Sequence, residues 1–315
     1  MSTLHRIAAA ELSRDELLST LEADGVVVID GLLSATMLAG MQRAFASRLE
    51  HMTFNTASGF VAEDNFRDMV HDVMTLHRGF VELALHDVLM ETVRGYVGRD
   101  FIMTEAKGWR SRETAQHFHG WHNDAWYDHD LDEVPRQLKI AVYLTDVEAG
   151  AFEYVPGSHG QRRAGHWSDG QARALTGRAP VTCVGGAGTV ILFDTSGVHR
   201  QQTPIPSERR ACFLVYNDPE IPLQRCDVDA YRYHPLLLNA ALLGGLSAEQ
   251  MRILGVGNQS LYRETWRPAP ERARHARSVE RVARALMHAE YTADRVARRV
   301  SRGIGQIARL VPAWR

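Results

Sequence analysis

Trp121-His122-Asn123-Asp124 is the stretch from which the fold of this chain is best predicted, together with His199, which follows Asp124 by 75 residues. On a β-strand, residues i and i+2 point to the same side of the sheet, so His122 and Asp124 would reach the same ion. Two histidines and one carboxylate are the smallest protein donor set that holds a mononuclear non-haem Fe(II) and leaves positions open. The spacing therefore predicts a metal site at these three residues, with His199 brought in by the fold.

Four segments after this stretch predict β-strands, because each is short, mainly apolar and bounded by turn residues. They are residues 139–145, 150–155, 188–193 and 210–216. Pro156-Gly157-Ser158-His159 is expected to form a sharp turn. His199 comes just after the third of these strands. The candidate ligands are thus expected on or beside strands of one antiparallel sheet system.

The order of these motifs resembles the phytanoyl-CoA dioxygenase family of Fe(II)/2-oxoglutarate oxygenases, which includes the ectoine hydroxylases. The motifs are W-H-N-D at 121–124, G-A-F-E-Y-V-P-G-S-H at 150–159, V-I-L-F-D-T-S-G-V-H at 190–199 and R-R-A-C-F-L-V-Y-N at 209–217. The segment that begins at Asp24-Gly25 is also similar to the start of many members. The resemblance covers roughly residues 20–220. It implies a double-stranded β-helix, the jelly-roll barrel that this family shares with cupins.

The resemblance implies iron ligands at His122, Asp124 and His199, and a partner for the C5-carboxylate of 2-oxoglutarate at Arg210. An arginine fork suits a dicarboxylate. Arg209 is the neighbouring candidate, but only one of two adjacent strand residues can face the site. Arg210 is preferred for its family spacing from His199 and for the apolar strand that follows it. The implied cosubstrates are 2-oxoglutarate and O2, with release of succinate and CO2.

Two comparisons with relatives narrow the expected reaction. Related halogenases have a small residue where Asp124 stands, so its presence here favours hydroxylation or another oxidation. The segment 125–132 lacks the F-E-T-W run of ectoine hydroxylases, so ectoine is not the expected substrate. The turn between Leu144 and Gly150 is also shorter than is usual in the family. A small molecule or a lipid-linked metabolite is the expected substrate class.

Several other residues near the motifs are weaker candidates. The only two lysines, Lys107 and Lys139, flank the metal motif, and either could contact cosubstrate or substrate; Lys107 is kept as a candidate cosubstrate ligand. His117 and His119 are expected to line the barrel or its rim, and His159 to be a turn residue that supports the site. The arginines next to this region, Arg110 and Arg112, are expected to be solvated.

A mainly β core with helical additions is the expected architecture. Residues 1–100 should supply a strand near Val26–Ile29 and helices near 36–49 and 80–96, and should pack on the barrel. Residues 101–220 should form the double-stranded β-helix. Residues 221–315 should form a C-terminal helical extension that ends in a basic tail, with Pro268 and Pro270 marking a break before it.

Length and composition favour a cytoplasmic enzyme. A chain of 315 residues, 45% of them hydrophobic, buries a full core. It has no run of 18 apolar residues, and its first 20 residues do not form a signal peptide. The three cysteines, Cys183, Cys212 and Cys226, are odd in number and lack C-x-x-C spacing, which indicates buried thiols in a reducing compartment.

The C-terminal tail carries a separate charge signal. Residues 270–315 hold 11 arginines against four acidic residues, a net charge of +7 in a chain whose total is −2. Within 294–311 an apolar residue recurs every three or four positions, which predicts one apolar helix face: Val296, Val300, Ile304, Ile307 and Val311. The favoured interpretation is packing on the acidic body or on a partner subunit of a homo-oligomer. Contact with an anionic membrane at the inner surface is the alternative, and nucleic acid is least favoured because no nucleic-acid module accompanies the charge.

Three functions stay open from the residues alone. The first is an Fe(II)/2-oxoglutarate-dependent hydroxylase. The second is a cupin-like metalloenzyme without 2-oxoglutarate, because His117-Phe-His119 with a later acid loosely imitates that motif. The third is a jelly-roll binding protein without catalysis. Specificity in such barrels lies in loops that vary on a shared scaffold, so the substrate itself is not predicted.

Overall fold

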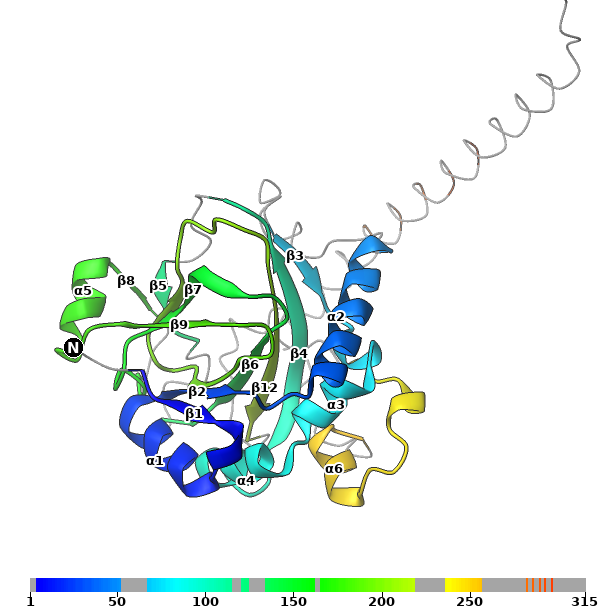
Figure 1. Cartoon of the computed structure of the whole chain (residues 1–315), viewed down its shortest axis with the longest axis horizontal. Helices are drawn as coiled ribbons and strands as arrows, with labels where there is room; N and C mark the ends of the chain where they lie inside the picture. The colour runs from blue at the N-terminus through cyan, green and yellow to red at the C-terminus, as the bar shows by residue number, and fades with distance from the viewer. Residues whose placement is uncertain are drawn as a thin grey trace, which may run out of the picture. The chain divides into compact units, whose positions relative to one another are not determined.

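The computed structural model describes residues 4–51, 67–114, 120–124, 134–161, 165–218 and 236–256, and five helical positions further on: Val282, Ala285, Ala289, Thr292 and Val296. The chain divides into two compact units, Met1–Gln259 and Ser260–Arg315. The first unit contains two β-sheets with helices around them (Figure 1).

Seven strands form the larger sheet, in the order β1-β2-β10-β6-β12-β4-β3. Their bounds are Arg6–Ala8 (β1), Val26–Asp30 (β2), Arg67–Val70 (β3), Ile102–Ser111 (β4), Leu138–Tyr143 (β6), Val190–Asp194 (β10) and Arg209–Asn217 (β12). The smaller sheet has the order β8-β5-β11-β7-β9. Its strands are His166–Trp167 (β8), Trp121–His122 (β5), His199–Gln201 (β11), Val147–Tyr154 (β7) and Val181–Gly185 (β9). Among these strands, only β1 and β2 pair in parallel.

The two sheets enclose a common interior. One buried cluster joins Ala141 and Phe193 of the larger sheet to Tyr154 and Cys183 of the smaller one. Because successive strand residues alternate between faces, one set of side chains on each strand points into this interior. The fold is therefore the predicted double-stranded β-helix, a mainly β core with helical additions.

Helices cover the outer face of the larger sheet. A second buried cluster joins Phe45 and Leu89 from helices to Leu192 and Leu214 from strands. These helices are α1 (Arg14–Asp24), α2 (Ala35–Glu50), α3 (Arg78–Ala84), α4 (Asp87–Tyr96) and α6 (Ala248–Ile253), with short 3-10 turns at Ala9–Glu11, Val73–Thr75 and Ala240–Leu242. A further helix, α5 (Asp169–Ala174), lies beside β8 of the smaller sheet. Because the larger sheet is buried on both faces, apolar residues occur on both sides of its strands.

Most predicted elements are confirmed, with two differences. The strand near 26–29 is β2 and the helix near 36–49 is α2. The helix expected over 80–96 is two helices, because α3 ends at Ala84 and α4 starts at Asp87, an acidic residue suited to a first turn. Residues 1–100 do more than pack on the barrel, since they supply β1, β2 and β3 to its larger sheet.

Little of the basic tail lies within the described residues. Val282, Ala285, Ala289, Thr292 and Val296 are helical and exposed, and the exposed fraction of Val296 is 54%. The other apolar positions predicted for 294–311 lie outside the described residues, as do Cys226 and Arg315. Cys183 and Cys212 are buried free thiols, as predicted. Within the described ranges, no helix has the length and apolarity needed to cross a membrane.

Candidate metal centre

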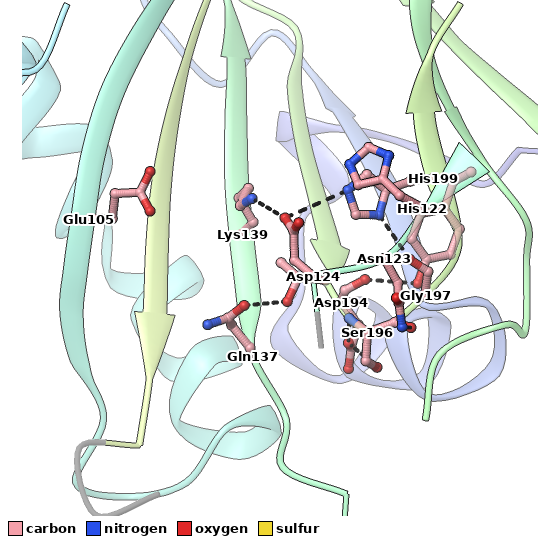
Figure 2. Close-up of polar contacts among 12 residues, drawn as sticks. Glu105, His122, Asn123, Asp124, Gln137, Lys139, Asp194, Ser196, Gly197 and His199 are labelled. Carbon is pink, nitrogen blue, oxygen red and sulfur yellow. Dashed lines mark hydrogen bonds and ion pairs between the residues drawn. The ribbon is translucent and has the colours of Figure 1, made fainter. Parts of the chain in front are cut away.

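The three predicted ligands come together in the smaller sheet. His122 lies on β5 directly opposite His199, the first residue of β11. Asp124 follows β5, and its Oδ2 lies 3.8 Å from Nε2 of His199. One ligand atom from each of the three residues lies within 4.8 Å of the others. Figure 2 shows the three side chains converging from neighbouring segments.

Hydrogen bonds set which nitrogen each histidine presents. Nδ1 of His122 lies 2.9 Å from the Gly120 carbonyl, and Nδ1 of His199 lies 2.8 Å from the Gly197 carbonyl. A carbonyl only accepts, so each Nδ1 carries the proton and each Nε2 is left with a lone pair. Burial lowers the pKa of both rings, that of His199 to about 3. Both histidines are therefore neutral at physiological pH and fit to bind a cation.

Asp124 is a carboxylate in the same environment. Burial by itself raises the pKa of Asp124, but the ammonium of Lys139 holds this pKa well below its usual value. Nζ of Lys139 lies 2.9 Å from Oδ2 of Asp124. The site thus offers two neutral imidazoles and one anion, a donor set that suits a divalent transition metal with open positions.

One turn, Asp194–Gly197, holds Asp124 and His199 in place, and this role was not predicted from the sequence. Its Thr195 carbonyl accepts the N–H of Asp124 at 2.8 Å, and its Ser196 carbonyl accepts from Nδ2 of Asn123 at 3.1 Å. Asp194 in turn accepts the backbone N–H of Ser196 at 2.8 Å. The Gly197 carbonyl accepts from Nδ1 of His199. Together these hydrogen bonds hold Asp124 and His199 in place. No residue type signals this role, because the contacts to the ligand segments are made by the backbone carbonyls of Thr195, Ser196 and Gly197.

The Pro156–His159 turn supports the strand of His199. Oγ of Ser158, a residue only 1% exposed, accepts the N–H of Val198 at 2.7 Å. His159 contacts helix α1, because its Nε2 lies 3.2 Å from the Glu22 carbonyl. These contacts agree with the predicted supporting role of this turn.

We expect Ser158→Ala to lower the free energy of unfolding by about 1–3 kcal/mol, because it leaves the buried N–H of Val198 without an acceptor. Chemical denaturation of both proteins measures this difference. Ser19→Ala is a suitable control, since Oγ of Ser19 bonds only the exposed Glu16 carbonyl. An unchanged stability of Ser158→Ala would show that Val198 finds another partner.

The strand parity of β12 is the opposite of the one that the preference for Arg210 over Arg209 requires. Arg209 shares its face of β12 with Ala211 of the interior cluster. Arg210 shares the outer face with Cys212, and its guanidinium pairs with Glu208 at 2.7 Å. Arg209 is 6% exposed and Arg210 is half-buried, so only Arg209 points into the barrel.

Arg209 is a buried cation of the barrel interior. Its Nη1 donates to the Gly150 carbonyl at 3.0 Å, and no acidic side chain pairs with it among the described residues. Burial lowers its pKa. Ser111 lies opposite Arg209 in the register, and its buried Oγ has no hydrogen-bond partner in the described part of the chain. Nε2 of Gln201, two residues after His199 on the same face of β11, is likewise buried without a partner. A buried cation opposite Ser111, in an interior with a second unpartnered polar group at Gln201, suits an anion.

Both lysines face the interior as well. Lys107 on β4 pairs with Glu105, and its Nζ lies 5.8 Å from the ring centre of Trp109. Figure 2 shows Glu105 and Lys139 on the same inner side of the larger sheet. Arg110 and Arg112 are not simply solvated, because both bind Asp68. His117 and His119 lie outside the described residues.

Solved structures with a similar fold agree with this architecture. The non-haem α-ketoglutarate dependent carbocyclase SnoK from nogalamycin biosynthesis is 20% identical, with a TM-score of 0.56 over 72% of this chain and 92% of its own. The epimerase SnoN of the same pathway is 21% identical, with a TM-score of 0.53 over 69% of this chain and 87% of its own. EctD from S. alaskensis, with bound Fe, is 22% identical, with a TM-score of 0.50 over 68% of this chain and 79% of its own.

The sequence itself matches one family model. No curated protein sequence gives a significant match to the chain. The family model described as phytanoyl-CoA dioxygenase (PhyH) matches residues 21–203, which include β2, the three converging ligands and the Pro156–His159 turn. With that match over more than half of its length, the chain belongs to the phytanoyl-CoA dioxygenase family.

Proposed function

We propose that this protein is an Fe(II)/2-oxoglutarate-dependent oxygenase that hydroxylates a small molecule or a lipid-linked metabolite. The observation that carries the proposal is the convergence of His122, Asp124 and His199 in the barrel interior that also contains the buried Arg209. SnoK and SnoN are described as α-ketoglutarate dependent and EctD as holding Fe, which supports the same cofactors here.

In this proposal His122, Asp124 and His199 hold the metal through Nε2, Oδ2 and Nε2. Three protein donors would leave positions on the metal for 2-oxoglutarate and O2. The bound iron supplies the activation of O2. The carbonyls of Gly120 and Gly197 keep the two imidazoles in the tautomer that binds metal.

Arg209 would bind the far carboxylate of 2-oxoglutarate. Its guanidinium has a single described hydrogen bond, to Gly150, so donors remain for a carboxylate. Ser111 and Gln201 would add a hydroxyl and an amide N–H, and this accounts for their buried unpartnered atoms. Lys107 remains a candidate for the same carboxylate or for the substrate.

In the overall reaction, 2-oxoglutarate would lose CO2 and take up one oxygen atom of O2 to become succinate. The other oxygen atom would be inserted into a C–H bond of the substrate. Aromatic rings surround His199 and would keep water from the reacting atoms. The ring centres of Phe193 and Phe152 lie 5.3 and 5.5 Å from that of His199.

Succinate release tests the proposal. Purified protein supplied with Fe(II), ascorbate, O2 and 2-oxoglutarate should form succinate, faster when its substrate is present. Anaerobic addition of Fe(II) and 2-oxoglutarate should also give a visible charge-transfer band, which needs no substrate. Metal binding without either signal would favour a cupin-like metalloenzyme, and absence of metal binding would favour a binding protein without catalysis.

For the basic tail, we propose a test of the alternative to packing, which is peripheral contact of 294–311 with an anionic membrane at the inner surface of the cell. Full-length protein should sediment with liposomes that contain anionic lipid and not with neutral ones, because each arginine near a charged surface adds roughly 1 kcal/mol. Raising the salt should weaken binding, since exposed charges are screened over about 8 Å at physiological ionic strength.

A deletion of residues 293–315 provides the control. It should remove liposome binding and leave 2-oxoglutarate turnover unchanged, because every proposed ligand precedes residue 220. An insoluble or inactive truncated protein would instead show that the tail packs on the body or on a second subunit.

A further inference from the structure

A cation of the protein itself lies at Oδ2 of Asp124, the carboxylate oxygen near Nε2 of His199. Nζ of Lys139 is 2.9 Å from Oδ2, the same oxygen that lies 3.8 Å from Nε2 of His199. The Lys139 side chain comes from β6 and is 12% exposed. On its other side Nζ lies 5.7 Å from the ring centre of Phe193. Figure 2 shows the ammonium pointing at Asp124 from the strand beside it.

The use of lysine at this position is unusual for this chain. Of its 36 basic residues only Lys107 and Lys139 are lysines, and both face the barrel interior. All the other basic residues among these 36 are arginines. A lysine ammonium differs in being a compact point charge on a flexible stem, which reaches a single oxygen and moves easily. Those properties suit a group that changes partners near a metal.

We infer that Lys139 is a positioning residue that neutralises Asp124 until a metal ion binds and then turns to an anion. This inference rests on the proposed function. A divalent cation bound through Oδ2 repels an ammonium at the same oxygen, so Lys139 must move away from that atom. Asp124 is its only acidic partner among the described residues. The ammonium released inside the barrel would then favour an anionic ligand, and the carboxylate groups of 2-oxoglutarate have that charge.

Metal and cosubstrate binding are therefore coupled through Lys139. Lys139 weakens metal binding when the metal binds alone, and it strengthens metal binding when a dicarboxylate binds as well. Because such a coupling is reciprocal, 2-oxoglutarate should strengthen metal binding by the same factor as the metal strengthens 2-oxoglutarate binding. A purely structural ion pair predicts the opposite effect of removing Lys139, since a loosened Asp124 would bind metal more weakly.

Calorimetric titration with Mn²⁺, with and without saturating 2-oxoglutarate, distinguishes the two. Lys139→Met, which keeps the length of the side chain without its charge, should bind Mn²⁺ alone at least about tenfold more tightly than the wild type. The extra tightening that 2-oxoglutarate gives should shrink in this variant. Lys139→Gln should bind Mn²⁺ alone as tightly as Lys139→Met does. Lys139→Arg keeps the charge, so its Mn²⁺ affinities with and without 2-oxoglutarate should resemble those of the wild type. Arg48→Met is a matched control, because it removes a half-buried ion pair with Asp72 outside the barrel interior.

Each result has a defined meaning. Unchanged or weaker Mn²⁺ binding by folded Lys139→Met and Lys139→Gln would overturn the role of Lys139. The metal site of the proposed function would still hold after such a result, provided that the wild type binds Mn²⁺ and His199→Ala does not. If the wild type itself binds no Mn²⁺, the proposed function fails and the inference fails with it.

Discussion

Replacing His199 with alanine should abolish Fe(II)-dependent turnover of 2-oxoglutarate while the protein stays folded. His199, His122 and Asp124 are the complete described donor set, and two donors do not hold the ion in a fixed geometry. Since loss of a group that merely orients a ligand already lowers metal affinity by about 10–100-fold, loss of a ligand should exceed about 100-fold. His122→Ala and Asp124→Ala should have the same effect. Succinate release and Mn²⁺ titration measure it, and circular dichroism checks the fold.

His166→Ala provides the matched control. His166 lies on β8 opposite His122, with the two ring centres 6.3 Å apart, and it is outside the converging donor set. Its removal should leave metal binding and turnover close to wild type. Wild-type turnover in any of the three ligand variants, at an iron concentration that just saturates the wild type, would refute the assignment.

The ligands could be predicted from the sequence because their chemistry constrains both residue type and spacing. A histidine and an aspartate two residues apart on an extended segment face the same way whatever surrounds them. The fold brings His199 opposite His122, and the family pattern already included it. The supporting turn at Asp194–Gly197 could not be predicted, since its roles are made through backbone carbonyls that any residue possesses.

The parity of β12 could not be predicted for a physical reason. A strand with one buried face shows alternating apolar and polar residues, and this alternation reveals which side faces inward. β12 is covered on both faces, by the barrel interior and by the helices. Ala211 and Phe213 are therefore apolar on one face, and Cys212 and Leu214 are apolar on the other. With no alternation to read, the preference for Arg210 rested on its spacing from His199 and on the apolar strand after it, and neither reveals which of two adjacent residues faces inward.

β4 was missed because its polar residues face inward. Glu105, Lys107 and Ser111 share the interior parity of this strand, while Gly108 faces the helices. A Cβ at Gly108 would lie 2.3 Å from a ring atom of Phe45, so a small residue is required there. Ile102–Ser111 thus lacks the pattern of an ordinary strand. Departures of this kind are expected where side chains serve a site instead of a core.

Arg209→Ala should raise the concentration of 2-oxoglutarate needed for half-maximal turnover by at least about tenfold, since a charge-assisted pair in a buried site contributes more than about 1.4 kcal/mol. The substitution also leaves the incoming carboxylate without its buried counter-ion, so the effect should exceed that of losing one neutral hydrogen bond. Mn²⁺ affinity measured without 2-oxoglutarate should change little, because Arg209 contacts none of the three ligands in the described structure. Arg209→Lys should recover part of the loss, since an ammonium keeps the charge but not the fork.

Arg210→Ala is the control that the structure supplies for this experiment. Its guanidinium binds Glu208 on the outer face of the sheet, so its loss should leave the 2-oxoglutarate requirement nearly unchanged. The two variants differ by one position in the chain and remove the same side chain, so a general effect of losing an arginine from β12 would appear in both. A larger effect from Arg210→Ala than from Arg209→Ala would mean that the active protein has the opposite strand parity. Equal and small effects would place the cosubstrate carboxylate elsewhere in the interior, with Lys107 as the next cation to test.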